Sequence, residues 1–291
     1  MAILQTNDIF KTELSEGQHR LSPEEIHKVQ QVVYGITIDI TELCSELNIP
    51  YMLTGGTALG AVRHGGFIPW DDDVDMGMPR PDYERFRKIA KKELKGKFRL
   101  RTIETDDEYR TYFCKIENTE VKLIREFFDK DSVVKKQVYA WIDIMPIDGM
   151  PKEADEFRKH HARILRARKM VAFSLMDKCM GTGKERSKKD MLIIRTGLKT
   201  NCYKLVNPLK AFRKFDGLCR KYPYEKSAIA GNTYGIYKEK EFVPKKVFGK
   251  GCMLPFEDIE LRCPQDYKAY LKSVYGNYEV LPPEDERRGH G

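Results

Sequence analysis

An acidic cluster constrains this chain more than any other feature. The segment WDDDVDM, residues 70–76, puts four aspartates into five consecutive positions. Carboxylates this close repel one another, so the cluster does not serve stability and calls for a cation. The run DVDMGM is strand-like, and alternate side chains of a strand share a face. We therefore expect Asp73 and Asp75 to point the same way, with Val74 on the opposite face.

Two carboxylates on one face form a hard-oxygen site that suits Mg²⁺, which keeps several waters and binds substrate phosphates. We expect one or two Mg²⁺ ions here, with Mn²⁺ as a substitute. Asp71 joins the site if the strand begins early, whereas Asp72 faces away. Taken alone, an Asp-x-Asp pair is more often a helix cap or a loose calcium site, so other segments must support the interpretation.

A third acid lies far along the chain, in the apolar strand pattern Trp141-Ile142-Asp143-Ile144. A carboxylate inside such a strand is costly to bury unless it has a partner or a metal. Asp143 is therefore either a hydrogen-bonded buried acid or a third member of the metal site.

A glycine pair precedes the acidic cluster. Residues 49–56, IPYMLTGG, resemble a short strand that ends in Gly55-Gly56, and residues 57–64 resemble a short helix. Glycines let the backbone approach a phosphate, and amides at a helix start point toward it. A glycine pair alone is more often a turn. In this order, however, the glycines and the three acids favour a metal-dependent phosphate-transfer site.

The order of these segments also indicates a fold. A glycine pair, an Asp-x-Asp pair and a later acid on another strand look like the polymerase-beta type of nucleotidyltransferase. We expect an α+β protein with a mixed-sheet core over residues 1–151, including an N-terminal helix that Ser22 and Glu25 begin with a capping box. A basic helical region, 152–221, and a C-terminal segment, 222–291, that folds back to the site would follow.

The net charge of +8 is unevenly placed along the chain. Between Arg158 and Lys221 there are 19 Lys and Arg but only four Asp and Glu. Such a stretch can face anionic lipid, nucleic acid or a phosphorylated substrate, or it can simply form solvated helix faces. Few aromatic residues alternate with these charges, so nucleic acid is not expected as a partner.

The sequence further suggests a cytoplasmic protein. Its N-terminus lacks an apolar stretch of signal-peptide length, and no run of 18 uncharged apolar residues predicts a membrane span. The seven cysteines include no CxxC pair, which is typical of reduced thiols.

A more specific resemblance rests on residues 55–86, GGTALGAVRHGGFIPWDDDVDMGMPRPDYERF. This block closely resembles the signature of the LicD family. The likeness continues, in the family's order, through CKIENT, WIDIMPIDGMP, KYPY, EFVPKKVFG, LPFED and DYKAYLKSVYGNYEVLPPEDERRGH. It covers nearly the whole chain after about residue 25.

The resemblance implies a reaction. The family includes bacterial enzymes that transfer phosphocholine from CDP-choline to sugar hydroxyls of cell-surface glycans such as lipopolysaccharide or teichoic acid, and it is distantly similar to fukutin-type ribitol-phosphate transferases. It implies CDP-choline or another CDP-alcohol as donor, CMP as product, and a glycan or glycolipid acceptor. Modification of a lipid-linked precursor would place the enzyme at the inner membrane face, with peripheral contact to anionic lipid.

The resemblance also assigns residues. The family's acids fall on Asp73, Asp75 and Asp143, as metal ligands and catalytic residues, and its ending places His290 among the catalytic residues. Arg63 and His64 could equally be an exposed helix end, and the tail with Arg287 and His290 could be disordered. The expected substrate-binding residues are Gly55, Gly56, Thr57, Arg63, His64, Trp70, Asp71, Lys115 and Arg287.

Two rival functions remain open at this point. The same acids would serve a true nucleotidyltransferase, which transfers a nucleotide from a nucleoside triphosphate and releases pyrophosphate. A non-catalytic binding module on the same scaffold is the other rival, and the intact acids argue against it.

Overall fold

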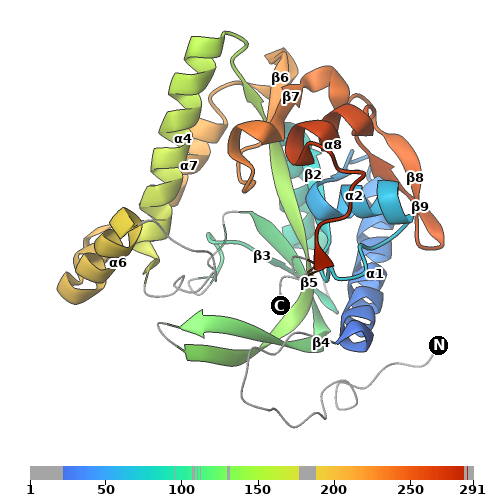
Figure 1. Ribbon diagram of the computed structural model, residues 1–291, viewed down its shortest axis with the longest axis horizontal. Helices are drawn as coiled ribbons and strands as arrows, with labels where there is room; N and C mark the ends of the chain where they lie inside the picture. The colour runs from blue at the N-terminus through green and yellow to red at the C-terminus, as the bar shows by residue number, and fades with distance from the viewer. Residues whose placement is uncertain are drawn as a thin grey trace.

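A computed structural model describes residues 22–94, 96–106, 109, 111, 113–129, 132–176, 188–284 and 287. Helices and a curled mixed sheet confirm the expected α+β class (Figure 1). In this part of the chain, no helix is both long enough and apolar enough to cross a membrane.

The sheet has seven strands and positions the acids. Five follow the spatial order β1-β2-β5-β4-β3, and β6 and β7 extend it from β5. Only β2 and β5 run parallel among the strand pairs of the described residues. The strands are β1 Met52–Leu53, β2 Asp75–Pro79, β3 Phe98–Arg101, β4 Cys114–Asp129, β5 Ser132–Met150, β6 Ile229–Asn232 and β7 Phe242–Pro244.

Helices surround this sheet, and a separate hairpin adjoins it. The helices are α1 Pro23–Glu46, α2 Gly55–His64, α3 Arg80–Glu93, α4 Ala154–Ser174, α6 Lys188–Thr200, α7 Pro208–Cys219 and α8 Tyr267–Tyr275. Short 3₁₀ turns are η1 Cys202–Leu205, η2 Tyr224–Lys226, η3 Lys238–Glu241 and η4 Lys245–Val247. The hairpin consists of β8 Cys252–Phe256 and β9 Ile259–Cys263.

The first helix forms as its sequence predicts. The Ser22 hydroxyl accepts from the Glu25 amide, and the Glu25 carboxylate accepts from the Ser22 amide, which confirms the capping box. The apolar stripe from Ile26 to Ile40 is buried, and α1 contacts β4 and β5. Packing of this stripe against the sheet therefore holds α1 in place.

Two local expectations differ from the structure. The helix expected from Thr57 begins at Gly55, because Thr54 is its N-cap and both glycines form its first turn. The patterns YFCKIEN, residues 112–118, and TEVKLIREF, residues 119–127, each predict a strand, whereas the structure has one strand, β4, whose register shifts between Asn118 and Lys122. A bulge can interrupt pairing without ending a strand, which explains the second difference.

The basic helical region has a core of its own. Helices α4 and α7 pack together around Ile164, Val171, Phe212 and Phe215. Met150, the last residue of β5, belongs to the same cluster. The hydrophobic core of these helices therefore extends to the C-terminal end of β5. The domain limits near residues 151 and 221 stay predictions.

A buried ion-pair network joins this layer to the sheet. Arg80, which follows β2, donates from Nε and Nη2 to the two carboxylate oxygens of Asp148 on β5, at 2.6 and 2.8 Å. Its Nη1 donates to Asp216 on α7 at 3.0 Å. Asp148 is fully buried and Arg80 is 7% exposed. The bidentate geometry satisfies charges that would otherwise be costly to bury.

Replacement of Arg80 by Met should destabilise the protein by about 3–5 kcal/mol, because Asp148 would stay buried without its cation. Urea denaturation measures this loss as a free energy of unfolding. Arg158→Ala is the matched control: it removes an ion pair whose side chains are 72% and 78% exposed. That change should cost less than about 1 kcal/mol. Equal losses in the two variants would contradict a structural role for the network.

Candidate active site

Three charged side chains stand in one row across adjacent strands. Asp75 at the start of β2 is the register partner of Asp143 on β5, and Asp143 is the partner of Lys115 on β4. The Asp143 amide donates to the Val74 carbonyl at 2.9 Å, which continues this register. Register partners place their side chains on the same face of a sheet. The fold therefore brings the Asp-x-Asp pair and the distant third acid together.

Lys115 partly offsets the charge of this row. Its ammonium lies 3.3 Å from Asp143 Oδ1 and 3.7 Å from the centroid of the Trp141 ring. Both contacts favour the charged lysine in a half-buried position. A lysine inside a strand pattern is thus explained by an acid and an aromatic ring on the neighbouring strand.

The remaining acids of the cluster lie close enough to affect one another. Asp71 is 8% exposed and Asp73 is half-buried. Burial raises the pKa of Asp75 well above its usual range, and the charges of Asp73, Asp143 and Asp71 raise it further. Burial likewise raises the pKa of Asp71, followed by the effect of Asp73. The cluster therefore resists carrying its full negative charge without a cation.

Helix α2 begins directly over these carboxylates. A Cβ added to Gly56 would lie 2.6 Å from Asp71 Oδ2, and one added to Gly55 would lie 3.0 Å from Asp75 Oδ2. Gly55 also has a φ of +54°, which disfavours other residues. The glycine pair thus lets the helix start approach the acids, where its dipole favours negative charge.

Hydrogen bonds fix this approach from both sides. The Asp75 amide donates to Thr57 Oγ1 at 2.8 Å, and the Thr54 amide donates to the Asp75 carbonyl at 3.0 Å. The Gly55 amide donates to Tyr270 Oη of α8 at 3.1 Å. The helix start is therefore tied both to the acidic strand and to the C-terminal segment.

The donor set suits a hard divalent cation, because it consists of carboxylates. In the part of the chain described here, no three His, Cys, Asp or Glu side chains are grouped as a ready-made metal site. Mg²⁺ typically binds through one or two carboxylates plus waters and substrate phosphates rather than an all-protein cage. The aligned Asp75 and Asp143, with Asp73 beside Asp75, fit that partial kind of site.

A second group of expected residues lies at the other end of α2. Arg63 lies on the order of 12 Å from Gly55 along the helix axis. The Arg63 guanidinium donates to the Tyr278 carbonyl at 3.1 Å and to His64 Nε2 at 3.0 Å. Burial, followed by the charge of Arg63, lowers the pKa of His64. The structure therefore does not place Arg63 and His64 in the acidic row.

Trp70 links this second group to the chain ending. Its ring lies 6.3 Å from the His64 ring, edge to face, and its centroid lies 5.4 Å from the Arg287 guanidinium carbon. Asp71, the next residue, reaches the first turn of α2. His290 lies outside the described residues, so its expected role stays a prediction.

Sequence reasoning missed several residues that surround the site. Glu241, at the end of η3, is 5% exposed, and its charge raises the pKa of Asp75. Tyr270 and Tyr275 of α8 approach Gly55, and the Tyr275 ring packs edge to face on Tyr237 at 5.1 Å. These residues lie in or beside segments that resemble the LicD family, but their local sequence patterns are typical of ordinary helices and turns.

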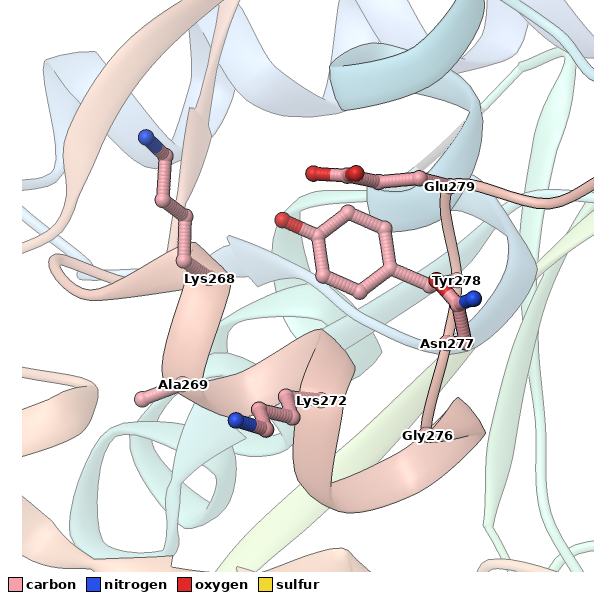
Figure 2. A pocket seen from close by; sticks show the side chains of 7 residues that line it. All are labelled: Lys268, Ala269, Lys272, Gly276, Asn277, Tyr278 and Glu279. Carbon is pink, nitrogen blue, oxygen red and sulfur yellow. The ribbon is translucent and has the colours of Figure 1, made fainter.

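A shallow pocket lies beside the second group of residues, between α8 and the turn that follows it (Figure 2). Its volume is about 430 Å³, and its lining includes the side chains of Lys268, Lys272, Asn277, Tyr278 and Glu279. The Tyr278 carbonyl that accepts from Arg63 belongs to this turn. Helix α2 thus contacts the acids at its first turn and the wall of this pocket at its last.

Parts of the chain are similar to known proteins. Residues 48–176 match the family model described as LicD/FKTN/FKRP, nucleotidyltransferase domain. The lipopolysaccharide cholinephosphotransferase LicD of Haemophilus influenzae is 28% identical over 260 residues, which cover 85% of this chain and 89% of that protein. Human ribitol 5-phosphate transferase FKRP is 60% identical over 30 residues, 10% of this chain and 6% of that protein.

Replacement of Gly56 by Ala should destabilise the protein by roughly 1–3 kcal/mol, because the new methyl group would press on the buried Asp71 carboxylate. Gly35→Ala in α1 is the matched control, since its added methyl meets nothing within 4 Å. That control should gain up to about 1 kcal/mol from helix propensity. Urea denaturation should therefore show opposite signs, and a gain in both variants would contradict the close approach at Gly56.

Glu241 should make stability depend on pH. Burial raises its pKa from 4.5 to about 7. The folded state then keeps a proton that the unfolded state releases, so this group costs stability as pH rises from 4.5 to 7. At pH 8, Glu241→Gln should be more stable than the wild type by up to about 3 kcal/mol.

Thermal denaturation at several pH values measures this difference. It should shrink toward zero as the pH falls below 4.5, where the wild-type carboxyl is also neutral. A difference that does not change with pH would contradict the raised pKa.

Proposed function

We propose that this chain transfers a phospho-alcohol group to a sugar hydroxyl of a glycan, because residues 48–176 match the LicD-type nucleotidyltransferase domain and most of the chain aligns with a LicD cholinephosphotransferase. The donor proposed is a CDP-linked alcohol, CDP-choline first, and CMP is the leaving product. The acceptor proposed is a cell-surface glycan or its lipid-linked precursor.

One observation carries this proposal: Asp75 and Asp143 share register beneath the glycine start of α2. This arrangement combines two features that phosphate chemistry needs, oxygen ligands for a cation and backbone amides directed at an anion. The names of the relatives supply the rest. The Haemophilus influenzae protein is a cholinephosphotransferase that acts on lipopolysaccharide, and FKRP is a ribitol 5-phosphate transferase.

The metal residues proposed are Asp73 and Asp75, with Asp143 as the third carboxylate. A bound Mg²⁺ would neutralise charge on the pyrophosphate and on the leaving CMP. Ionisation of Asp75 is disfavoured by burial and by its acidic neighbours, so the cation also sets the protonation state of its own ligands. Mn²⁺ has the same ligand preferences and is the expected substitute.

The phosphate contacts proposed come from the glycines and from Lys115. The amides of the first turn of α2 carry the positive end of the helix dipole, and Gly55 and Gly56 let this turn lie close to the acids that would hold the cation and its phosphate. Lys115, held beside Asp143 at 3.3 Å, adds a positive charge in the same row. These contacts position the donor phosphorus for in-line attack by the acceptor hydroxyl.

The aromatic residues do not identify the alcohol. A quaternary ammonium group is usually held by aromatic rings. Here the Trp141 ring already contacts the Lys115 ammonium, and the Trp70 ring contacts the Arg287 guanidinium. The donor test therefore needs choline, ribitol, glycerol and ethanolamine forms side by side.

Wild-type protein should release CMP from one CDP-alcohol in the presence of Mg²⁺ and a mixed glycan acceptor. Asp75→Asn should lower this rate by about 100-fold or more, because charge stabilisation by a metal is worth several kcal/mol. Asp39→Asn is the matched control, because Asp39 lies on α1 and pairs with Lys97 at 2.6 Å, with side chains that are 38% and 44% exposed. Chromatography of the nucleotide products measures the rates.

Product analysis separates this proposal from its rivals. A nucleotidylated acceptor with free pyrophosphate would identify a true nucleotidyltransferase. Equal CMP release by the wild type and Asp75→Asn would contradict the proposed site. No metal-dependent turnover of any CDP-alcohol or nucleoside triphosphate would indicate a binding module instead.

A further inference from the structure

A surface on α6 and η1 combines exposed apolar side chains with positive charge. Among the described residues, eight large apolar side chains are exposed, and four of them lie between residues 170 and 205. Leu192 and Ile193 of α6 are 66% and 44% exposed, and Leu205 of η1 is 87% exposed. We call these three residues the α6 apolar patch. Exposed apolar side chains that gather in one part of a protein typically mark an interaction surface.

The packing of α6 shows which side of the helix faces outward. Ile194 is 7% exposed, and a Cβ added to Gly197 would lie 2.7 Å from Met176 Sδ. Residues three apart share a helix face, so Ile194 and Gly197 form the inward side. Leu192 lies about 200° around the helix from Ile194 and therefore points away from the protein body.

Positive charges flank the patch. Arg195 and Lys199, three and seven residues after Leu192, are exposed and lie within about 60° of it around the helix. Lys204, next to Leu205, is exposed as well. Residues 188–214 contain eight Lys and Arg and one acid, Asp190. The outward side of α6 and η1 therefore pairs apolar groups with cations rather than with ions of both signs.

The position of α6 leaves this side accessible. Figure 1 shows α6 at the outer edge of the helical layer, across α4 from the sheet and far from α2 and β2. The turn η1 contacts both α4 and α6, which holds the patch on a folded layer. A flat surface that meets the protein at this edge would contact the patch first.

We propose that the α6 apolar patch, with Arg195, Lys199 and Lys204, docks the protein on the surface of an anionic lipid bilayer. Interfacial helices of this kind insert leucine and isoleucine at the boundary of the acyl chains while lysine and arginine contact acidic headgroups. The charge pattern favours this occupant, because acidic headgroups supply counter-charges for the three exposed cations, whereas a neutral bilayer does not.

Vesicle binding by the 291-residue chain tests this without any substrate, so its result is independent of the catalytic proposal. The vesicles consist of phosphatidylcholine with or without phosphatidylglycerol, and flotation at low and high salt measures the bound fraction. The wild type should float only with the anionic vesicles, and less so at high salt. The combined variant Leu192→Ser, Ile193→Ser, Leu205→Ser should lose binding by at least about tenfold.

Two further variants separate the contributions. Ile236→Ser, Met253→Ser and Val280→Ser together remove three exposed apolar side chains elsewhere on the chain and should leave binding unchanged. Arg195→Gln, Lys199→Gln and Lys204→Gln together should weaken binding and flatten its salt dependence. Unchanged thermal melting in each variant shows that folding is intact.

Several outcomes overturn the proposal. These are the absence of wild-type binding to anionic vesicles, equal binding to neutral vesicles, and equal losses in the patch and control variants. Sedimentation provides the last test: a wild-type dimer that the patch variant abolishes, without vesicle binding, would make this surface a self-association face.

Discussion

The parallel pairing of β2 with β5 is the constraint on which the site depends. It puts Asp75 and Asp143 side by side, although they are far apart in sequence. Asp71 and Asp73 approach the same place because the segment before β2 is short. Coulomb repulsion among buried carboxylates costs stability that a compensating cation restores. The fold therefore holds these carboxylate oxygens at fixed positions, although their mutual repulsion lowers its stability.

The C-terminal segment contributes to this arrangement from the opposite side. The Tyr270 hydroxyl accepts a hydrogen bond from the Gly55 amide. The Tyr275 side chain lies near the same glycine and contacts the Tyr237 ring. Glu241 adds another buried carboxyl whose pKa rises to about 7. Helix α8 therefore helps to fix the first turn of α2 in place beside the acids.

The sequence predicts those features that local chemistry decides. The capping box at Ser22 and Glu25 begins α1, and Val74 is buried as expected, although strand β2 begins only at Asp75 rather than at Asp73. The family resemblance adds the nucleotidyltransferase domain. Register lies beyond local rules, because pairing Asp75 with Asp143 and Asp143 with Lys115 is a property of the assembled sheet. The approach of Glu241 to the acids likewise depends on how η3 packs, and its own segment contains only alternating charges.

The uneven distribution of charge gives the cation a role before any chemistry. The chain as a whole carries a net charge of +8, so its long-range field favours the approach of anions. Close to the acids, however, Asp71, Asp73, Asp75 and Asp143 outnumber Lys115, and a pyrophosphate that approaches this row alone meets repulsion. The helix dipole of α2 and one ammonium group do not offset four carboxylates. We therefore propose that a divalent cation would control the binding of an anionic donor at this site as well as its rate of reaction.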